Sequence, residues 1–347
     1  MTKLLLALLI PAHSLAFTVV SNSSQRGVEA LMIGAGQARL GSYGSLSGNT
    51  SLLAWTNGKQ KFISTNVVTY ITSSDDTTSL APKFVPHLAA SVEKWGDYVV
   101  SYGLVGDTDR FEVSSHDETQ NDFRGMNSSY SGVIGFAKKV NPSLAIGMNL
   151  SLDYMTAENS GSGHTDTSLF SFTSHEAVIT SQVGVNFSYK FSSWALGGSF
   201  KAPFAKYWSE GKQKVKTYDQ NLPNVIVIEE NTKPSISFSS EARLGAMKKI
   251  DSHKLYLDFV YTPSYTDADY EEEANDGYQI NFSHEINFMP KINLLYGLSY
   301  AEDTYLAMAG LSKSNNHSRT FYGLGHGQDR EGSYRMYHLV FGTYFDY

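Results

Sequence analysis

The stretch GVNFSYKFSSWALGGSFK, residues 184–201, decides the fold class. Apolar side chains occupy every second position from Val185 to Phe191, and polar residues stand between them. A two-residue turn at 192–193 follows, and the alternation then resumes at Trp194. Because successive side chains of a β-strand point to opposite faces, this pattern predicts two antiparallel strands, each with an apolar and a polar face.

The same period of two recurs in four further stretches: 144–154, 280–288, 292–300 and 337–347. Each run lasts about ten residues, which is the length that a tilted strand needs to cross a bilayer. Strands of soluble sandwiches are shorter on average. Polar residues such as Asn281 and Glu285 on the second face would be costly in a dry core but not in a wet lumen. The sequence therefore predicts an all-β, transmembrane antiparallel β-barrel.

Connections of two lengths alternate along the chain, which is typical of short periplasmic turns and long extracellular loops. The long polar connections are expected at 73–82, 106–122, 157–176, 206–231 and 264–275. The expected strands are 62–72, 83–94, 97–106, 123–139, 142–156, 178–191, 193–204, 232–249, 253–263, 276–289, 291–301, 304–313, 317–327 and 333–347. This gives fourteen strands, with twelve as the alternative because the boundaries between 304 and 327 are weakly marked.

The composition excludes several classes of function. The 347 residues include no cysteine, so disulfides, thiolate catalysis and Cys-based zinc sites are ruled out. The chain has 34 acidic and 27 basic side chains, which gives a formal net charge of −7. This charge does not indicate the basic surface that binds nucleic acid. The sequence has no Walker A, His-Glu-x-x-His or Gly-x-Ser-x-Gly motif. We expect no enzyme, no cofactor and no nucleic-acid partner.

An acidic cluster lies in the fifth expected long connection, formed by Asp267, Asp269, Glu271, Glu272 and Glu273. Carboxylate oxygens are the ligands that Ca²⁺ prefers. A solvated acidic loop has the same composition, and we take it as the expectation, with no metal site.

Both ends of the chain indicate an outer-membrane location. Lys3, the apolar run 4–10 and the small-x-small pattern at 14–16 predict a signal peptide over residues 1–16. The last strand ends on the aromatic Tyr347 and resembles the C-terminal signal read by the outer-membrane assembly machinery. We expect a protein of the cell outer membrane in a Gram-negative envelope, with that machinery and outer-membrane lipid as partners.

Residues 17–61 differ in kind from the barrel, 62–347. They lack sustained alternation and are rich in glycine, which permits the tight turns of a compact segment. A free tail would expose apolar side chains such as Leu31, Ile33 and Leu52 to water. We expect this segment to fold inside the barrel as a plug.

Two motifs in this segment carry a family resemblance: Gly34-Ala35-Gly36-Gln37-Ala38-Arg39-Leu40-Gly41, and residues 49–58 with Trp55-Thr56-Asn57-Gly58. They resemble the FadL family of outer-membrane transporters for long-chain fatty acids and other hydrophobic molecules. In that family a Gly-Ala-Gly-x-Ala-x-x-Gly-like start is followed by an Asn-Pro-Ala-Gly motif, whereas Pro-Ala is missing after Asn57 here. The resemblance implies a fourteen-stranded barrel with an N-terminal plug that transports a hydrophobic small molecule.

Six residues are candidates for the site. Arg39 can pair with a ligand carboxylate or with an acid of the barrel wall. Leu52, Leu53 and Trp55 can line an apolar pocket or pack the plug against the wall. The resemblance implies a kinked third strand that opens the wall towards the membrane, and Gly103 and Gly106 lie in that strand; they can equally leave space beside the plug.

The leading hypothesis is passive, plug-gated transport of hydrophobic small molecules such as long-chain fatty acids. A general diffusion porin is the first alternative. A structural or adhesive barrel that acts through its extracellular loops is the second.

Overall fold

The structure is a computed structural model that describes residues 48–56, 59–72, 83–115, 121–165, 168–219, 225–233, 240–263, 265–267, 272–274, 276–301, 304–329 and 334–346. The expected signal peptide lies outside the described residues. The elements are η4 (Thr50–Trp55), β1 (Gln60–Thr72), β2 (Lys83–Trp95), β3 (Tyr98–Ser115), β4 (Asn121–Lys139), β5 (Leu144–Thr165), β6 (Ser168–Phe191), β7 (Trp194–Asp219), β8 (Ile226–Thr232), β9 (Glu241–Ile250), β10 (His253–Thr262), β11 (Tyr265–Asp267), β12 (Glu272–Ala274), β13 (Gly277–Met289), β14 (Ile292–Ala301), β15 (Thr304–Ser314), β16 (Ser318–Asp329) and β17 (Tyr334–Asp346).

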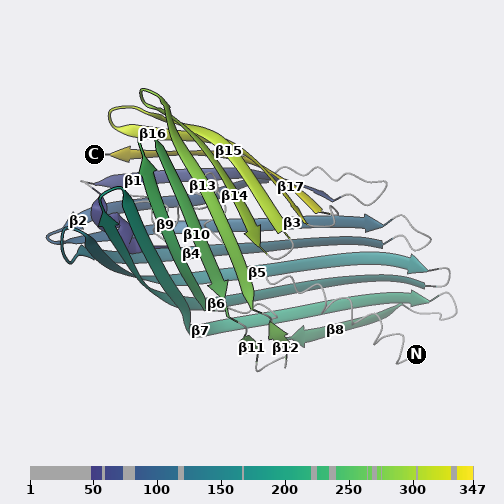
Figure 1. The fold of residues 1–347 in the computed structure, drawn as a ribbon. Coiled ribbons are helices and arrows are strands. Elements are labelled where there is room, and N and C mark those ends of the chain that lie inside the picture. Colours follow the sequence, from purple (N-terminus) through teal and green to yellow (C-terminus); the bar gives the residue numbers. More distant parts are fainter. Residues whose placement is uncertain are drawn as a thin grey trace.

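Within the described part of the chain, fourteen antiparallel strands close into a barrel (Figure 1). Neighbours in sequence pair around the wall, β7 pairs with β9 and β10 with β13, and β1 closes the ring on β17. The expected count of fourteen is confirmed. β8 pairs with the outer part of β7, and β11 pairs with β12, outside this ring.

The expected long connections were placed wrongly on one side of the barrel. Most of 106–122, 157–176 and 206–231 continues as strand, so that β3 to β7 run far beyond the other strands (Figure 1). The backbone ladder between β5 and β6 continues through these stretches without a register shift. The connection expected at 73–82 lies outside the described residues, and the strand expected from 232 begins at Glu241.

Short turns at 96–97, 192–193, 251–252 and 290–291 lie at the end of the barrel where β1 begins and β17 ends. Ser192, Asp251 and Lys291 have positive φ in three of these turns, at 46°, 50° and 69°. Such left-handed backbone suits two-residue hairpin loops. We call this the turn end; it corresponds to the periplasmic side of outer-membrane barrels.

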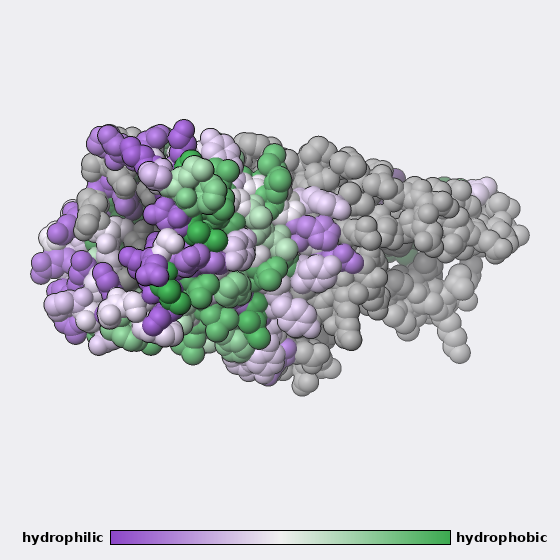
Figure 2. All heavy atoms as spheres, turned by 45° about the horizontal axis from the view of Figure 1, so that its top comes forward, coloured by the Kyte–Doolittle hydropathy of each residue, from purple (hydrophilic) through white to green (hydrophobic). Residues whose placement is uncertain are grey.

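The side chains that face lipid and those that face the lumen alternate along the strands as the sequence predicts. Phe187, Tyr189, Leu196 and Phe341 are exposed on the outer wall, and Phe282, Ile286 and Leu294 share that face. Figure 2 shows the resulting hydrophobic band, bordered at the turn end by hydrophilic residues. A closed antiparallel barrel with such a band has the architecture of an outer-membrane protein.

The inner face of the barrel is polar, and several of its polar side chains are buried from solvent. Asn186, Asn281 and Glu285 face the lumen as predicted and are buried, whereas Lys190 lies near the turn end and is exposed. No helix among the described residues is long and apolar enough to span a bilayer.

Candidate functional site

A short 3-10 helix, η4, lies inside the turn-end half of the barrel. Its first turn is closed by the Leu52 N–H, which donates to the Asn49 carbonyl at 3.1 Å. Its end is fixed by Thr56, whose N–H and hydroxyl both donate to the Leu53 carbonyl, at 3.0 and 2.7 Å. Residues 50–54 are buried.

Polar groups of β6 hold η4 along its length. The Asn49 amide donates to the Phe187 carbonyl at 2.8 Å. The Ser51 N–H donates to the Asn186 side-chain carbonyl at 2.9 Å. The Trp55 indole N–H donates to the Ser188 hydroxyl at 2.8 Å. These bonds satisfy buried polar groups, which would otherwise be costly to leave unpaired.

Two wall glycines make the space in which η4 lies. A Cβ at Gly135 would stand 2.6 Å from the Thr50 Cγ2, and a Cβ at Gly147 would stand 2.6 Å from the Ser51 nitrogen. Any side chain at these two positions would collide with η4, so the wall is shaped to the segment. On β5, Asn149 adds a hydrogen bond from its amide to the Thr50 hydroxyl at 3.2 Å.

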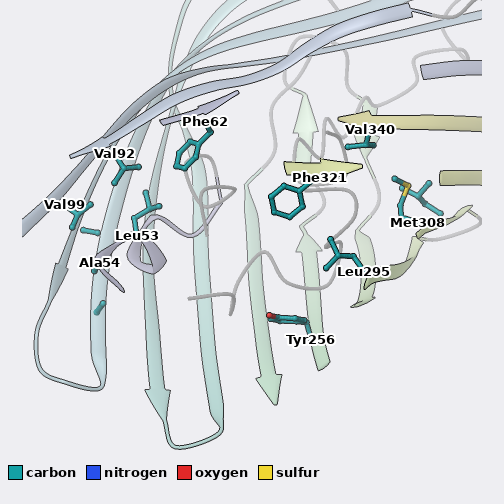
Figure 3. Close-up of a cluster of buried hydrophobic side chains, with 13 residues drawn as sticks. Leu53, Ala54, Phe62, Val92, Val99, Tyr256, Leu295, Met308, Phe321 and Val340 are labelled. Carbon is teal, nitrogen blue, oxygen red and sulfur yellow. The ribbon is translucent and has the colours of Figure 1, made fainter. Parts of the chain in front are cut away.

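Apolar side chains fill the lumen beside η4 (Figure 3). Leu53 and Ala54 belong to one buried cluster with residues from ten strands on both sides of the barrel. The other members are Phe62, Val92, Val99, Ala137, Ala145, Tyr256, Leu295, Leu306, Met308, Phe321 and Val340. At this level the lumen therefore resembles a protein core rather than a water channel.

A second, smaller apolar cluster extends from the first along β2, β3 and β4. Leu88, Val105 and Val133 are its buried members, and Ala90 packs against both clusters. The lumen thus holds continuous apolar surface from η4 to this part of the wall.

The wall is irregular where the second cluster lies. The ladder between β2 and β3 runs from Trp95↔Tyr98 to Leu88↔Val105. On the other side of β2, the register to β1 shifts between Ser64 and Thr65, so that residue 87 is the extra residue of a bulge. Among the described pairings, none joins residues 83–87 of β2 to β3.

The opposite wall carries buried ionic groups. Glu285 accepts hydrogen bonds from Arg319 at 2.8 Å, Asn293 at 2.6 Å and Tyr256 at 3.1 Å, with the Lys254 ammonium at 3.4 Å. Nearer the extracellular side, Arg243 forms a two-pronged pair with Glu241 at 2.5 and 2.8 Å. Both guanidinium groups are thereby engaged by carboxylates of the wall, as buried charges require.

The structure describes five of the six candidate site residues. Leu52 and Leu53 are fully buried, Trp55 is partly buried, and all three lie on η4 inside the barrel. Gly103 and Gly106 lie in β3, whose register with β4 is unbroken from Tyr98 to Ser115. Arg39 lies outside the described residues. The structure does not test the assigned roles of these residues.

Sequence reasoning missed the groups that receive η4. Asn149, Asn186, Gly135 and Gly147 all sit in strands of ordinary alternation, and nothing local distinguishes them from lumen-lining residues. Pro86 was a usable signal for the irregular wall, because proline inside a strand is confined to edges and bulges.

The acidic cluster is only partly described. Asp267, Glu272 and Glu273 lie on the β11–β12 hairpin. Among the described residues, no group of three or more His, Asp or Glu side chains is arranged to hold a metal ion.

No protein-family model and no curated protein matches this chain. Solved structures do match its fold. The toluene transporter TbuX of Ralstonia pickettii aligns with a TM-score of 0.77 and 11% identity, over 94% of this chain and 100% of that one. The toluene transporter TodX of P. putida aligns with a TM-score of 0.71 and 12% identity, over 88% and 94%.

A FadL homologue of Pseudomonas aeruginosa also aligns, with a TM-score of 0.58 and 12% identity, over 90% of this chain and 95% of that one. The fold of this chain is therefore the FadL-like barrel, in agreement with the resemblance of its N-terminal motifs. These three solved barrels are described as transporters or as a FadL homologue.

Proposed function

We propose that this protein transports hydrophobic small molecules passively across the outer membrane, with residues 17–61 as a plug that blocks an open water channel. The observation that supports this most strongly is the burial of Leu53 and Ala54 in an apolar cluster that joins both sides of the lumen. An open diffusion porin would need a continuous polar passage at this level.

A lateral route to the membrane fits the apolar surface of the lumen. Ala90 links the η4 cluster to Leu88, Val105 and Val133, beside the place where the β2–β3 ladder ends. A hydrophobic molecule that moves along this surface avoids the aqueous periplasm. We propose the wall between β2 and β3 as its exit, with Gly103 and Gly106 in the strand that borders it.

Two arginines of the lumen wall already pair with carboxylates, which favours neutral compounds over carboxylates at this wall. Arg243 and Arg319 are engaged by Glu241 and Glu285, so a fatty-acid carboxylate would have to displace a buried wall carboxylate from either. The neighbouring folds include toluene transporters, which supports a neutral aromatic hydrocarbon as the first compound to test. We expect saturable uptake of toluene to exceed that of a long-chain fatty acid.

Removal of the plug tests the function. Residues 17–58 are deleted while the signal peptide is kept, and folding is checked by heat modifiability on gels. We expect single-channel conductance to rise from near zero and saturable uptake of toluene to disappear. Unchanged conductance and uptake in the folded deletion variant would exclude the plug, and the porin or adhesive hypotheses would then take its place.

A further inference from the structure

Basic side chains are concentrated at the turn end of the barrel. We define the turn-end rim as residues 59–61, 93–98, 138–144, 190–194, 248–254, 289–293, 313–319 and 344–346. This rim contains twelve basic and four acidic side chains, a formal excess of eight positive charges. The remainder of the chain contains fifteen basic and thirty acidic side chains, so its sign is opposite.

The rim lysines divide between the two faces of the wall. Lys59 and Lys254 pair with Glu93 and Glu285, and Lys291 lies in a turn. Strand alternation directs four of the other rim lysines outward and four into the mouth of the lumen. The outward set is Lys61, Lys138, Lys248 and Lys313, and the inward set is Lys94, Lys139, Lys190 and Lys249. In the inward set, the Lys139 and Lys190 ammonium groups lie 5.1 and 5.9 Å from the centre of the Trp55 ring.

Aromatic rings accompany two of the outward lysines. The Lys138 ammonium lies 4.7 Å from the centre of the Tyr98 ring, and the Lys248 ammonium lies 4.3 Å from that of Trp194. Both rings are exposed on the lipid side, where tyrosine and tryptophan occupy the headgroup level of a bilayer. The two ammonium groups are therefore at the depth of the headgroups.

The one rim carboxylate on the outer face of β2 does not cancel this charge. Glu93 is paired with Lys59 at 2.7 Å and accepts a hydrogen bond from Tyr102 at 3.3 Å. The Lys138 and Lys248 ammonium groups thus lie beside exposed rings on the outer wall, and Figure 2 shows the hydrophilic rim directly beside the hydrophobic band.

We propose that the outward face of the turn-end rim binds the phosphate groups of anionic phospholipids in the periplasmic leaflet. Lysine ammonium groups pair with phosphate as point charges, and their apolar stems lie along the hydrophobic wall. Each lysine near an anionic membrane surface raises affinity about fivefold. This interaction is independent of the transported compound and rests only on the outer-membrane placement of the barrel.

The test uses the full-length protein in a non-ionic detergent and native mass spectrometry with added phosphatidylglycerol. The variant K61Q/K138Q/K248Q/K313Q removes the outward lysines. The variant K94Q/K139Q/K190Q/K249Q removes the same charge from the same end but from the lumen side, and it serves as the matched control. Heat modifiability confirms that each variant is folded, and K138Q and K248Q are measured singly if the quadruple variant does not fold.

We expect the outward variant to bind phosphatidylglycerol about 600-fold more weakly than the unmodified protein, since four contributions of about fivefold are lost. The inward variant should bind it nearly as well. Binding to the unmodified protein should also weaken as salt is raised. Equal loss in both variants, loss in the inward variant alone, or loss in neither would overturn the proposal.

Discussion

Depth in the bilayer determines what a charge costs at a lipid-facing position of β14. Leu294 is the third residue of this strand, close to the turn, whereas Leu298 lies near its middle and is 56% exposed. We expect Leu298→Arg to lower the free energy of unfolding in lipid by about 2–4 kcal/mol and Leu294→Arg by about 0–1 kcal/mol. Denaturant titrations of the barrel refolded into vesicles measure both.

The inward neighbour provides the control for the register. Asn293 faces the lumen beside Glu285, so the guanidinium of Asn293→Arg can pair with that carboxylate, and we expect little loss. If arginine is tolerated at 298 as well as at 293, the assignment of faces along β14 is wrong.

Gly147 is one of the two wall glycines that are fitted closely to η4. A Cβ there would stand 2.6 Å from the Ser51 nitrogen and 2.4 Å from the Asn186 Oδ1. We expect Gly147→Ala to cost about 1–3 kcal/mol, as overpacking does. The displaced η4 should also raise single-channel conductance.

Gly132 is the matched control on the same sheet, because a Cβ at that position meets nothing within 4 Å. Gly132→Ala should leave conductance unchanged. A Gly147→Ala protein with the stability and conductance of the Gly132→Ala protein would mean that the close fit has no role in holding η4.

At the scale of the element, β3 carries the prediction about lateral exit. Gly103 and Gly106 pair in regular register with Val133 and Tyr130 of β4, beside the end of the β2–β3 ladder. Two valines at these positions would add branched side chains where the ladder ends. We expect Gly103→Val/Gly106→Val to reduce toluene uptake several-fold without reducing the yield of folded barrel. Undiminished uptake in cells with equal amounts of folded protein would rule out this exit.

Most of the strands could be predicted from the sequence because lipid outside and polar groups inside impose a period of two. Residues 184–201 form the β6–β7 hairpin as expected, with its turn at 192–193. The same reasoning failed beyond the bilayer, where Lys212, Lys214 and Lys216 alternate on β7 without an apolar partner face. In that region the strand is defined by its backbone pairing with β6 and β8. Backbone pairing cannot be recognised in a single sequence, because it does not depend on the type of side chain.

The candidate site was only partly predictable. Apolar residues in a glycine-rich segment indicated that Leu52 and Leu53 would be buried, and they are. The partners of η4 could not be inferred, because Asn186 and Gly147 become neighbours of Ser51 only when the barrel closes. Contacts between residues this far apart in the sequence depend on the assembled strands of the wall.

At the scale of the whole molecule, the two sides of the lumen differ in chemistry. The wall of β1 to β6 holds η4 and the second apolar cluster, whereas the wall of β9 to β16 carries the charged groups around Arg243 and Glu285. Leu53 and Ala54 complete the apolar cluster that joins both walls, so removal of η4 should open a passage that also borders the charged groups of β9 to β16. This explains why the deletion of 17–58 is expected to create conductance while it abolishes selective uptake.

The pairing of β1 with β17 also sets the order in which the barrel can be completed. All of β1 pairs with β17, yet residues 73–333 lie between the two strands, and the ribosome makes β17 last. Until β17 arrives, β1 and β16 are open edges that can pair with other chains. Pairing between such distant segments is slow to form. The barrel therefore remains vulnerable to aggregation until β17 has been made and has paired with β1.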